Sequence, residues 1–179
     1  MVAHLDQLFA AWPAKILIAD DEAAVRRVLR RILEAAGYCV VEAATGSEVV
    51  LLGESERPDL FILDIAIPHV DGVEICRAIK SDPATHLTPV IHVTGQTQRQ
   101  DRLRALEAGS DEFVAKPFDA EELLIRVRSL LRTKRLTDHL VSDEDVLEAL
   151  SRAVEARDNF TEQHLHRVAD HSVELNERA

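Results

Sequence analysis

Four apolar runs in the sequence each end in a side chain that can do polar chemistry. The residues that end these runs are Asp20-Asp21, Asp64, Thr94 and Lys116. Buried parallel strands read as short continuous apolar runs, and ligands gather at the carboxyl ends of such strands. We therefore expect three carboxylates, a hydroxyl and an ammonium group to converge on one edge of one sheet.

A cluster of this kind can hold a divalent cation and accept a phosphoryl group. Carboxylates a few ångström apart repel one another, and Mg²⁺ relieves the repulsion because it takes hard oxygen ligands and keeps waters that bind phosphate oxygens. An Asp carboxylate can then act as the nucleophile on an activated phosphoryl group. Lys116 would supply a positive charge to a phosphoryl oxygen, and Thr94 would supply a hydrogen-bond donor.

The elements that must position these side chains alternate between strand and helix. Strands are expected near residues 15–20, 38–43, 59–64, 89–94 and 112–116. Helices are expected from the apolar spacing of Val25 to Leu33, over about 46–54, 73–81 and 97–108, and after Asp119, where Glu122 completes a capping-box pattern. Strict alternation over this length predicts an α/β fold, a five-stranded doubly wound parallel sheet with a C-terminal helical extension.

Composition limits the function classes. The chain has 179 residues, of which 46% are apolar, so a real core is expected. A net charge of −11 disfavours binding to nucleic acid or anionic lipid. No apolar run is long enough to cross a membrane, and Cys39 and Cys76 suit two reduced, buried thiols, so we expect a cytoplasmic protein.

Three segments are expected along the chain. Residues 1–14 form an N-terminal extension, 15–132 form the α/β domain, and 133–179 form a helical linker followed by the incomplete start of an output domain. Residues 135–179 hold eleven acids against five arginines, and their apolar residues keep helical spacing. An amphipathic tail too short for its own core is expected to pair with another helix, plausibly in a second copy of the chain.

The ordered set of residues over about 15–132 resembles the receiver domain of two-component response regulators. The matching features are Asp20-Asp21, Asp64, a loop from Pro68 to Asp71-Gly72, Thr94, and Lys116-Pro117. The resemblance implies a flavodoxin-like receiver fold and a cis bond before Pro117. It also implies a sensor histidine kinase as the phosphoryl donor. A haloacid dehalogenase-like phosphatase fits less well, because its nucleophile and second Asp would lie two positions apart on the first strand.

The same resemblance implies a role for each site residue. Asp64 would be the phosphoacceptor, and Mg²⁺ would be bound by Asp20, Asp21, Asp64 and the backbone carbonyl of Ala66. Lys116 and Thr94 would contact the phosphoryl group.

Thr94 would move on phosphorylation, and Phe113 would turn inward into the vacated space. Phe113 has no hydroxyl, so this switch would be steric. The signal would pass through the face made by the helix at 97–108, the strand at 112–116 and the helix after Asp119. A homodimer could form through that face or through the C-terminal helix.

The tail is similar to the opening of HD-GYP domains, which are metal-dependent phosphodiesterases of cyclic di-GMP. The similarity rests on Asp158, Phe160-Thr161, His164 and Arg167-Val168. In that family the counterpart of His164 is a metal ligand, but solvent-facing histidines remain the simpler interpretation of His164 and His171. Most ligands of such a centre are missing, so we expect no enzyme activity from this polypeptide. The alternative function is the regulatory part of such a phosphodiesterase; a DNA-binding output lacks a helix-turn-helix or a basic region in the tail.

Overall fold

The computed structural model describes residues 13–67, 70–95 and 99–140. The chain divides into two compact units after Arg135, and the first unit contains the sheet. Its elements are β1 (Lys15–Ala19), α2 (Ala23–Ala35), β2 (Cys39–Ala43), α3 (Gly46–Glu56), β3 (Leu60–Leu63), α4 (Gly72–Ser81), β4 (Val90–Thr94), α5 (Arg99–Glu107) and β5 (Glu112–Ala115). Residues 120–140 are also helical and are called the C-terminal helix.

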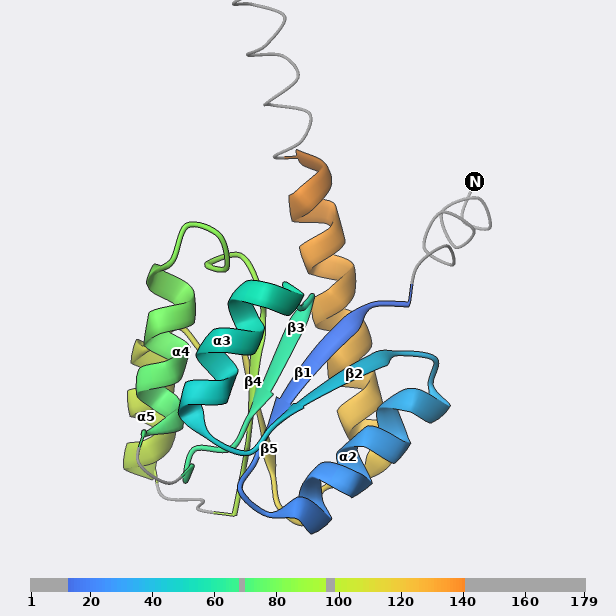
Figure 1. Ribbon diagram of the computed structural model, residues 1–179, viewed down its shortest axis with the longest axis vertical. Coiled ribbons are helices and arrows are strands. Elements are labelled where there is room, and N and C mark those ends of the chain that lie inside the picture. Colours follow the sequence, from blue (N-terminus) through green and yellow to red (C-terminus); the bar gives the residue numbers. More distant parts are fainter. Residues whose placement is uncertain (1–12, 68–69, 96–98, 141–179) are drawn as a thin grey trace, which may run out of the picture. The chain divides into compact units, whose positions relative to one another are not determined.

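The five strands form one parallel sheet in the order β2-β1-β3-β4-β5. The chain runs from β1 outward to β2 on one side, then crosses to β3 and continues outward on the other side (Figure 1). The order therefore reverses between β1 and β3, which is where open α/β sheets bind ligands. The predicted five-stranded, doubly wound parallel sheet is confirmed.

Two apolar layers cover the sheet because side chains alternate between its faces along each strand. Leu17 and Phe61 face α3, α4 and α5, whereas Ile16 and Ile62 face α2 and the C-terminal helix. Figure 1 shows the same division, with α3, α4 and α5 on one side of the sheet and α2 on the other. Strands that are buried on both faces explain why the sequence shows continuous apolar runs rather than alternation.

Aspartates cap two helix starts, one at Asp71, which the sequence placed only in a loop, and one at the predicted Asp119. The Asp71 carboxylate accepts from Val73 N at 3.0 Å and caps α4. Asp119 Oδ1 accepts from the backbone N–H groups of Glu121 and Glu122 at 2.8 and 3.0 Å. The Glu122 carboxylate, however, bonds to Arg126 one turn later rather than back to the cap. The capping-box pattern is therefore confirmed only in its Asp119 half, because a cation at the next turn attracts the glutamate.

The two thiols differ in environment. Cys76 lies on the buried face of α4, as predicted, and burial raises the pKa of its thiol to about 11. Cys39 is exposed, so the prediction of a buried thiol there is wrong. The cause is its position at the first residue of β2, which is an outer strand of the sheet.

Gly72 permits a close approach of two backbone segments. A Cβ atom at this position would lie 2.1 Å from the carbonyl oxygen of Asp64 and 2.9 Å from the Cα of Ile65. Gly72 N donates to Ile65 O at 2.9 Å, which ties the start of α4 to the end of β3. Among the residues that the structure describes, none of the helices combines the length and the apolar character that a bilayer crossing needs.

Candidate functional site

Three carboxylates meet at the carboxyl edge of the sheet, beside the point where the strand order reverses. Asp20 and Asp21 follow β1, and Asp64 follows β3; one ligand oxygen from each lies within 4.8 Å of the others. Asp20 is 1% exposed and Asp64 is 6% exposed, while Asp21 is exposed. Buried acidic groups this close need a compensating cation.

Lys116 supplies a positive charge inside this cluster. Its Nζ donates to Asp20 Oδ2 at 2.6 Å and to Asp64 Oδ2 at 2.8 Å. Burial by itself lowers the pKa of Lys116, but the hydrogen bonds to Asp20 and Asp64 and the charges of both groups outweigh it, so the pKa is raised. Lys116 is therefore held as an ammonium ion between two carboxylates.

Backbone contacts at the strand ends hold this geometry. Lys116 N donates to Thr94 O at 2.8 Å, and Asp64 N donates to Ala19 O at 2.8 Å. The Lys116–Pro117 peptide bond is cis, as the resemblance implied. The site is thus formed by the sheet itself rather than by long loops.

Thr94, whose carbonyl accepts from Lys116 N, lines one cavity of about 240 Å³ together with Phe113. Thr94 is buried at the end of β4, and Phe113 is partly buried on β5. The guanidinium carbon of Arg102 lies 5.7 Å from the centre of the Phe113 ring, within cation–π range. The other residues that line this cavity include Ile65, Ala115, Glu122 and Arg126.

His92 is a buried polar residue that the sequence analysis did not single out. It is fully buried in β4, pairs in register with Phe113, and stacks on that ring with the centroids 5.6 Å apart. Its ring nitrogens lie 2.8 Å from Ser110 Oγ and 3.3 Å from Gly72 O. Burial lowers the pKa of His92, against smaller opposing effects from the Gly72 carbonyl, Asp71 and Asp64. A histidine inside an otherwise apolar strand, two residues before Thr94, was the available signal.

A second residue that the sequence analysis missed is Arg26. Its Nη1 donates to the backbone carbonyls of Asp20 and Asp21 at 2.6 and 3.2 Å, and its Nε lies 3.2 Å from Glu42 Oε2. No short motif marks this contact, because Arg26 lies among three other arginines of α2.

The structure brings Asp20, Asp21, Asp64 and Lys116 together as predicted. Thr94 and Phe113 share the neighbouring cavity. The N–H of Ala66 lies 3.3 Å from Asp64 Oδ1, which places this residue beside the cluster. His164 and the whole HD-GYP-like segment lie outside the described residues.

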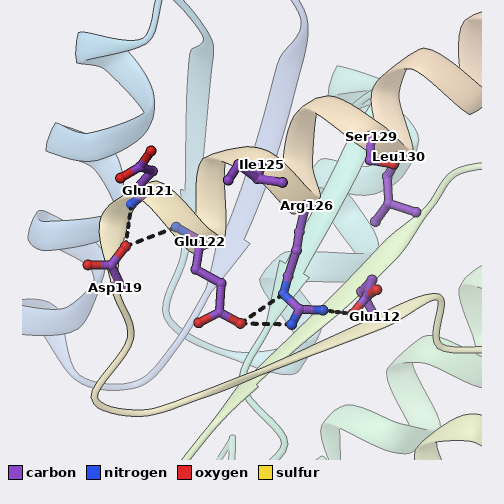
Figure 2. Close-up of a pocket in the computed structure, with 8 residues that line it drawn as sticks. All are labelled: Glu112, Asp119, Glu121, Glu122, Ile125, Arg126, Ser129 and Leu130. Carbon is purple, nitrogen blue, oxygen red and sulfur yellow. Dashed lines mark hydrogen bonds and ion pairs between the residues drawn. The ribbon is translucent and has the colours of Figure 1, made fainter.

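A groove on the described surface has none of the acid-cluster residues in its lining. It has a volume of about 490 Å³ and is lined by residues of β5 and the C-terminal helix, among them Glu112, Ile125 and Arg126. Figure 2 shows Arg126 between Glu112 and Glu122, with which it forms ion pairs. Its charged lining, in which Arg126 is already paired with two glutamates, suits a protein contact.

The donor set of the acid cluster fits a hard divalent cation. Carboxylate oxygens from two strand ends converge without any sulfur or imidazole donor among the three residues, and Mg²⁺ prefers such oxygen ligands. A carboxylate at the end of β3, with an ammonium group beside it, is also the arrangement expected for a nucleophile that receives an anionic group.

Comparison with known proteins points to one family. The model of the response regulator receiver domain family matches residues 16–128. The transcriptional regulatory protein ResD of Bacillus subtilis is 40% identical over 125 residues, which cover 70% of this chain and 51% of ResD. Response regulator MprA of Mycobacterium ulcerans is 40% identical over 129 residues, 72% of this chain and 55% of MprA. The chain thus spans about half the length of the curated relatives that it matches.

Solved structures give the same result. A putative response regulator from Chloroflexus aurantiacus superposes with a TM-score of 0.66 at 34% identity and covers 68% of this chain and 99% of its own. The receiver domain of a signal transduction histidine kinase from Syntrophus aciditrophicus superposes with a TM-score of 0.64 at 36% identity, covering 67% of this chain and 91% of its own.

Proposed function

Because the chain belongs to the receiver domain family of two-component response regulators, we propose that Asp64 accepts a phosphoryl group from a sensor histidine kinase. In this step an Asp64 oxygen bonds to phosphorus, the bond from phosphorus to the donor breaks, and the donor leaves with the electron pair. The position of Asp64 carries the proposal: it lies at the end of β3, shares the ammonium group of Lys116 with Asp20, and is slightly more exposed than Asp20.

Mg²⁺ is proposed as the cofactor, held by Asp20, Asp21, Asp64 and the backbone carbonyl of Ala66. When bound, the ion would offset the negative charge of the incoming phosphoryl group. Lys116 would turn from the carboxylates toward a phosphoryl oxygen, and the Thr94 hydroxyl would donate to another. The clustering of the three carboxylates supports this assignment.

We further propose that Phe113 reports the state of Asp64 to the surface. The cavity that Thr94 and Phe113 share gives the ring space to move if Thr94 shifts toward the phosphoryl group. Arg126 and Glu122 line both this cavity and the groove on β5 and the C-terminal helix (Figure 2), so a moved ring would change the surface beside it.

The structure of the described residues gives no partner chain and no output domain. A homodimer through the α5, β5 and C-terminal helix face, or through the tail, stays a prediction. The HD-GYP alternative depends on residues 147–168, and the family match ends at residue 128. ResD is named as a transcriptional regulatory protein and MprA as a response regulator, and the parts of those proteins beyond the span of this chain do not define its output.

The decisive experiment is phosphoryl transfer to the intact chain from acetyl phosphate with Mg²⁺, followed by mass spectrometry. We expect one phosphoryl group per wild-type chain and none on Asp64→Asn. Asp59→Asn is the matched control, because Asp59 lies at the opposite end of β3, where its carboxylate accepts from Lys15 N. Incorporation that persists in Asp64→Asn would refute the assignment.

A further inference from the structure

Arg26 makes an unusual set of contacts beside the acid cluster. It lies in the first turn of α2, and its guanidinium reaches back over the end of β1 to the carbonyls of Asp20 and Asp21. Its side chain is 15% exposed; the contact with Asp20 O is partly buried and the one with Asp21 O lies at the surface. The carboxylate of Glu42, from the neighbouring strand β2, faces the other side of the guanidinium at 3.2 Å.

A cation such as Arg26 is not favoured in the first turn of a helix. The positive end of the helix dipole lies at the N-terminus, where acidic side chains stabilise a helix and cations do not. The first turn of α2 has no acidic residue, and its capping residue Glu22 makes no side-chain capping bond. Departures from local rules are expected where a residue serves a site. Arg26 therefore needs an explanation outside the helix.

The turn that Arg26 contacts carries Asp21, the one exposed carboxylate of the three. Asp20 is buried, Lys116 donates to its Oδ2, and its Oδ1 accepts from Glu22 N at 2.9 Å. Asp21 is exposed, so the direction of its side chain depends on the backbone of the turn. The two carbonyl contacts of Arg26 hold the two peptide groups on either side of the Asp21 Cα.

We propose that Arg26 is a positioning residue for the divalent cation: it holds the Asp20–Asp21 turn through both carbonyls, and Glu42 holds Arg26 in place. The inference rests on the proposed function, because it assumes that the acid cluster binds Mg²⁺. It adds to that function a residue pair that touches neither the ion nor the phosphoryl group.

The sign of the effect separates positioning from simple electrostatics. Removal of a positive charge near a cation site strengthens cation binding, since it removes repulsion. Loss of a positioning residue weakens binding, and changes to groups that orient metal ligands typically cost about tenfold or more in affinity. A weaker site in an Arg26 variant would therefore report lost positioning and could not be caused by the change in charge.

The test is calorimetric titration of the full chain with Mg²⁺. We expect Arg26→Gln to weaken binding about tenfold and Arg26→Lys to recover part of it, because Lys keeps a donor but not the fork that reaches two carbonyls. Arg31→Gln, an exposed arginine on the same helix, is the matched control and should bind as wild type or slightly tighter. Amide NMR signals of residues 20–23 without Mg²⁺ should shift in Arg26→Gln and stay in place in Arg31→Gln.

A double-mutant cycle tests the role of Glu42. Glu42→Gln should weaken Mg²⁺ binding on its own but should add nothing in the Arg26→Gln background, because it acts through Arg26. Equal or tighter binding in Arg26→Gln would overturn the inference, and so would an equal loss in Arg31→Gln. If wild type binds no Mg²⁺, the proposed function itself fails; if wild type binds and the Arg26 variants match it, only the role of Arg26 fails.

Discussion

At the scale of single residues, the ammonium group of Lys116 neutralises the pocket from within. It contacts Asp20 and Asp64 at hydrogen-bond distance, and both carboxylates are almost entirely buried. A metal ion at the same carboxylates would take over part of this role. The energetic weight of Lys116 should therefore depend on whether Mg²⁺ is present.

We expect Lys116→Met to lower the free energy of unfolding by about 2–3 kcal/mol in EDTA, because two buried carboxylates lose their cation. Saturating Mg²⁺ should restore most of this loss. Urea unfolding with and without Mg²⁺ measures both values.

The matched control is Lys80→Met. Lys80 pairs with Asp111 at 2.8 Å and has a similar exposure, but it lies outside the acid cluster. The free energy of unfolding that Lys80→Met loses should be the same with and without Mg²⁺. An Mg²⁺-independent loss in Lys116→Met would contradict the shared role of lysine and ion.

His92 leads to a prediction about acid stability. Burial lowers its pKa below the ordinary value of 6.5, so the unfolded chain takes up a proton at a higher pH than the folded one. Stability from this group is complete above about pH 6.5 and falls as the pH drops toward the folded-state pKa. Replacement of His92 by Gln should flatten the fall in unfolding free energy between pH 6.5 and 5 by up to about 1.4 kcal/mol per pH unit.

The slope, rather than the absolute stability, is the measurement, because the substitution also changes packing against Phe113 and Ser110. His86→Gln is the control, since the His86 side chain is exposed and its Nδ1 lies 2.9 Å from Pro83 O at the surface. An unchanged slope in His92→Gln would show that His92 does not resist protonation in the fold.

At the scale of elements, the junction of β3 and α4 sets the site. Gly72 lies against the carbonyl of Asp64. Its own carbonyl oxygen lies 3.3 Å from Nε2 of the buried His92 ring. The start of α4, the loop after Asp64 and the ring of His92 beside Phe113 therefore meet at one glycine. A side chain at this position would push on all three.

We expect Gly72→Ala to cost about 3 kcal/mol or more, because its Cβ would overlap main-chain atoms that cannot move without displacing Asp64. Gly95→Ala is the matched control: nothing lies within 4 Å of a Cβ at that position, so its stability should stay within about 0.5 kcal/mol of wild type. Thermal and urea unfolding of both variants decide this. A neutral Gly72→Ala would mean that the junction can relax.

At the scale of the whole molecule, the sheet and its two apolar layers form a folding unit. The buried apolar residues of the described structure run from Ala14 to Leu131, and the C-terminal helix contributes Leu123, Val127 and Leu131 to the layer that faces α2. The unit therefore needs that helix up to about Leu131.

A chain that ends at Arg135 should unfold cooperatively and bind beryllofluoride with Mg²⁺ as the full chain does. A chain that ends at Arg126 loses Val127 and Leu131 and should be destabilised by several kcal/mol, comparable to two large-to-small core substitutions. Circular dichroism melts of the two truncations give the comparison. Equal melting temperatures would show that residues 127–135 of the C-terminal helix do not stabilise the folded unit.

The sequence was sufficient for the sheet and for most of the site. Strand ends such as Asp64 and Lys116 could be predicted because each follows an unbroken apolar run, and parallel strands bring their ends together. Helix and strand bounds agree to within a few residues.

The roles of Arg26 and His92 could not be predicted in this way. Both depend on contacts between residues from different elements, such as Arg26 with Glu42 and His92 with Ser110. The environment of Cys39 was missed for a related reason, since the strand order that leaves β2 at an edge is a property of the assembled sheet.

That strand order also bears on how copies of the folded unit behave when concentrated. The two outermost strands, β2 and β5, each have one edge without a partner strand in the sheet, and such edges in other proteins can recruit a strand from a neighbouring molecule. Here both are short, at five and four residues, and β5 is flanked by Glu112 and Lys116. Growth of fibril-like aggregates by edge-to-edge addition should therefore be slow, and crowding should favour contacts between helices instead.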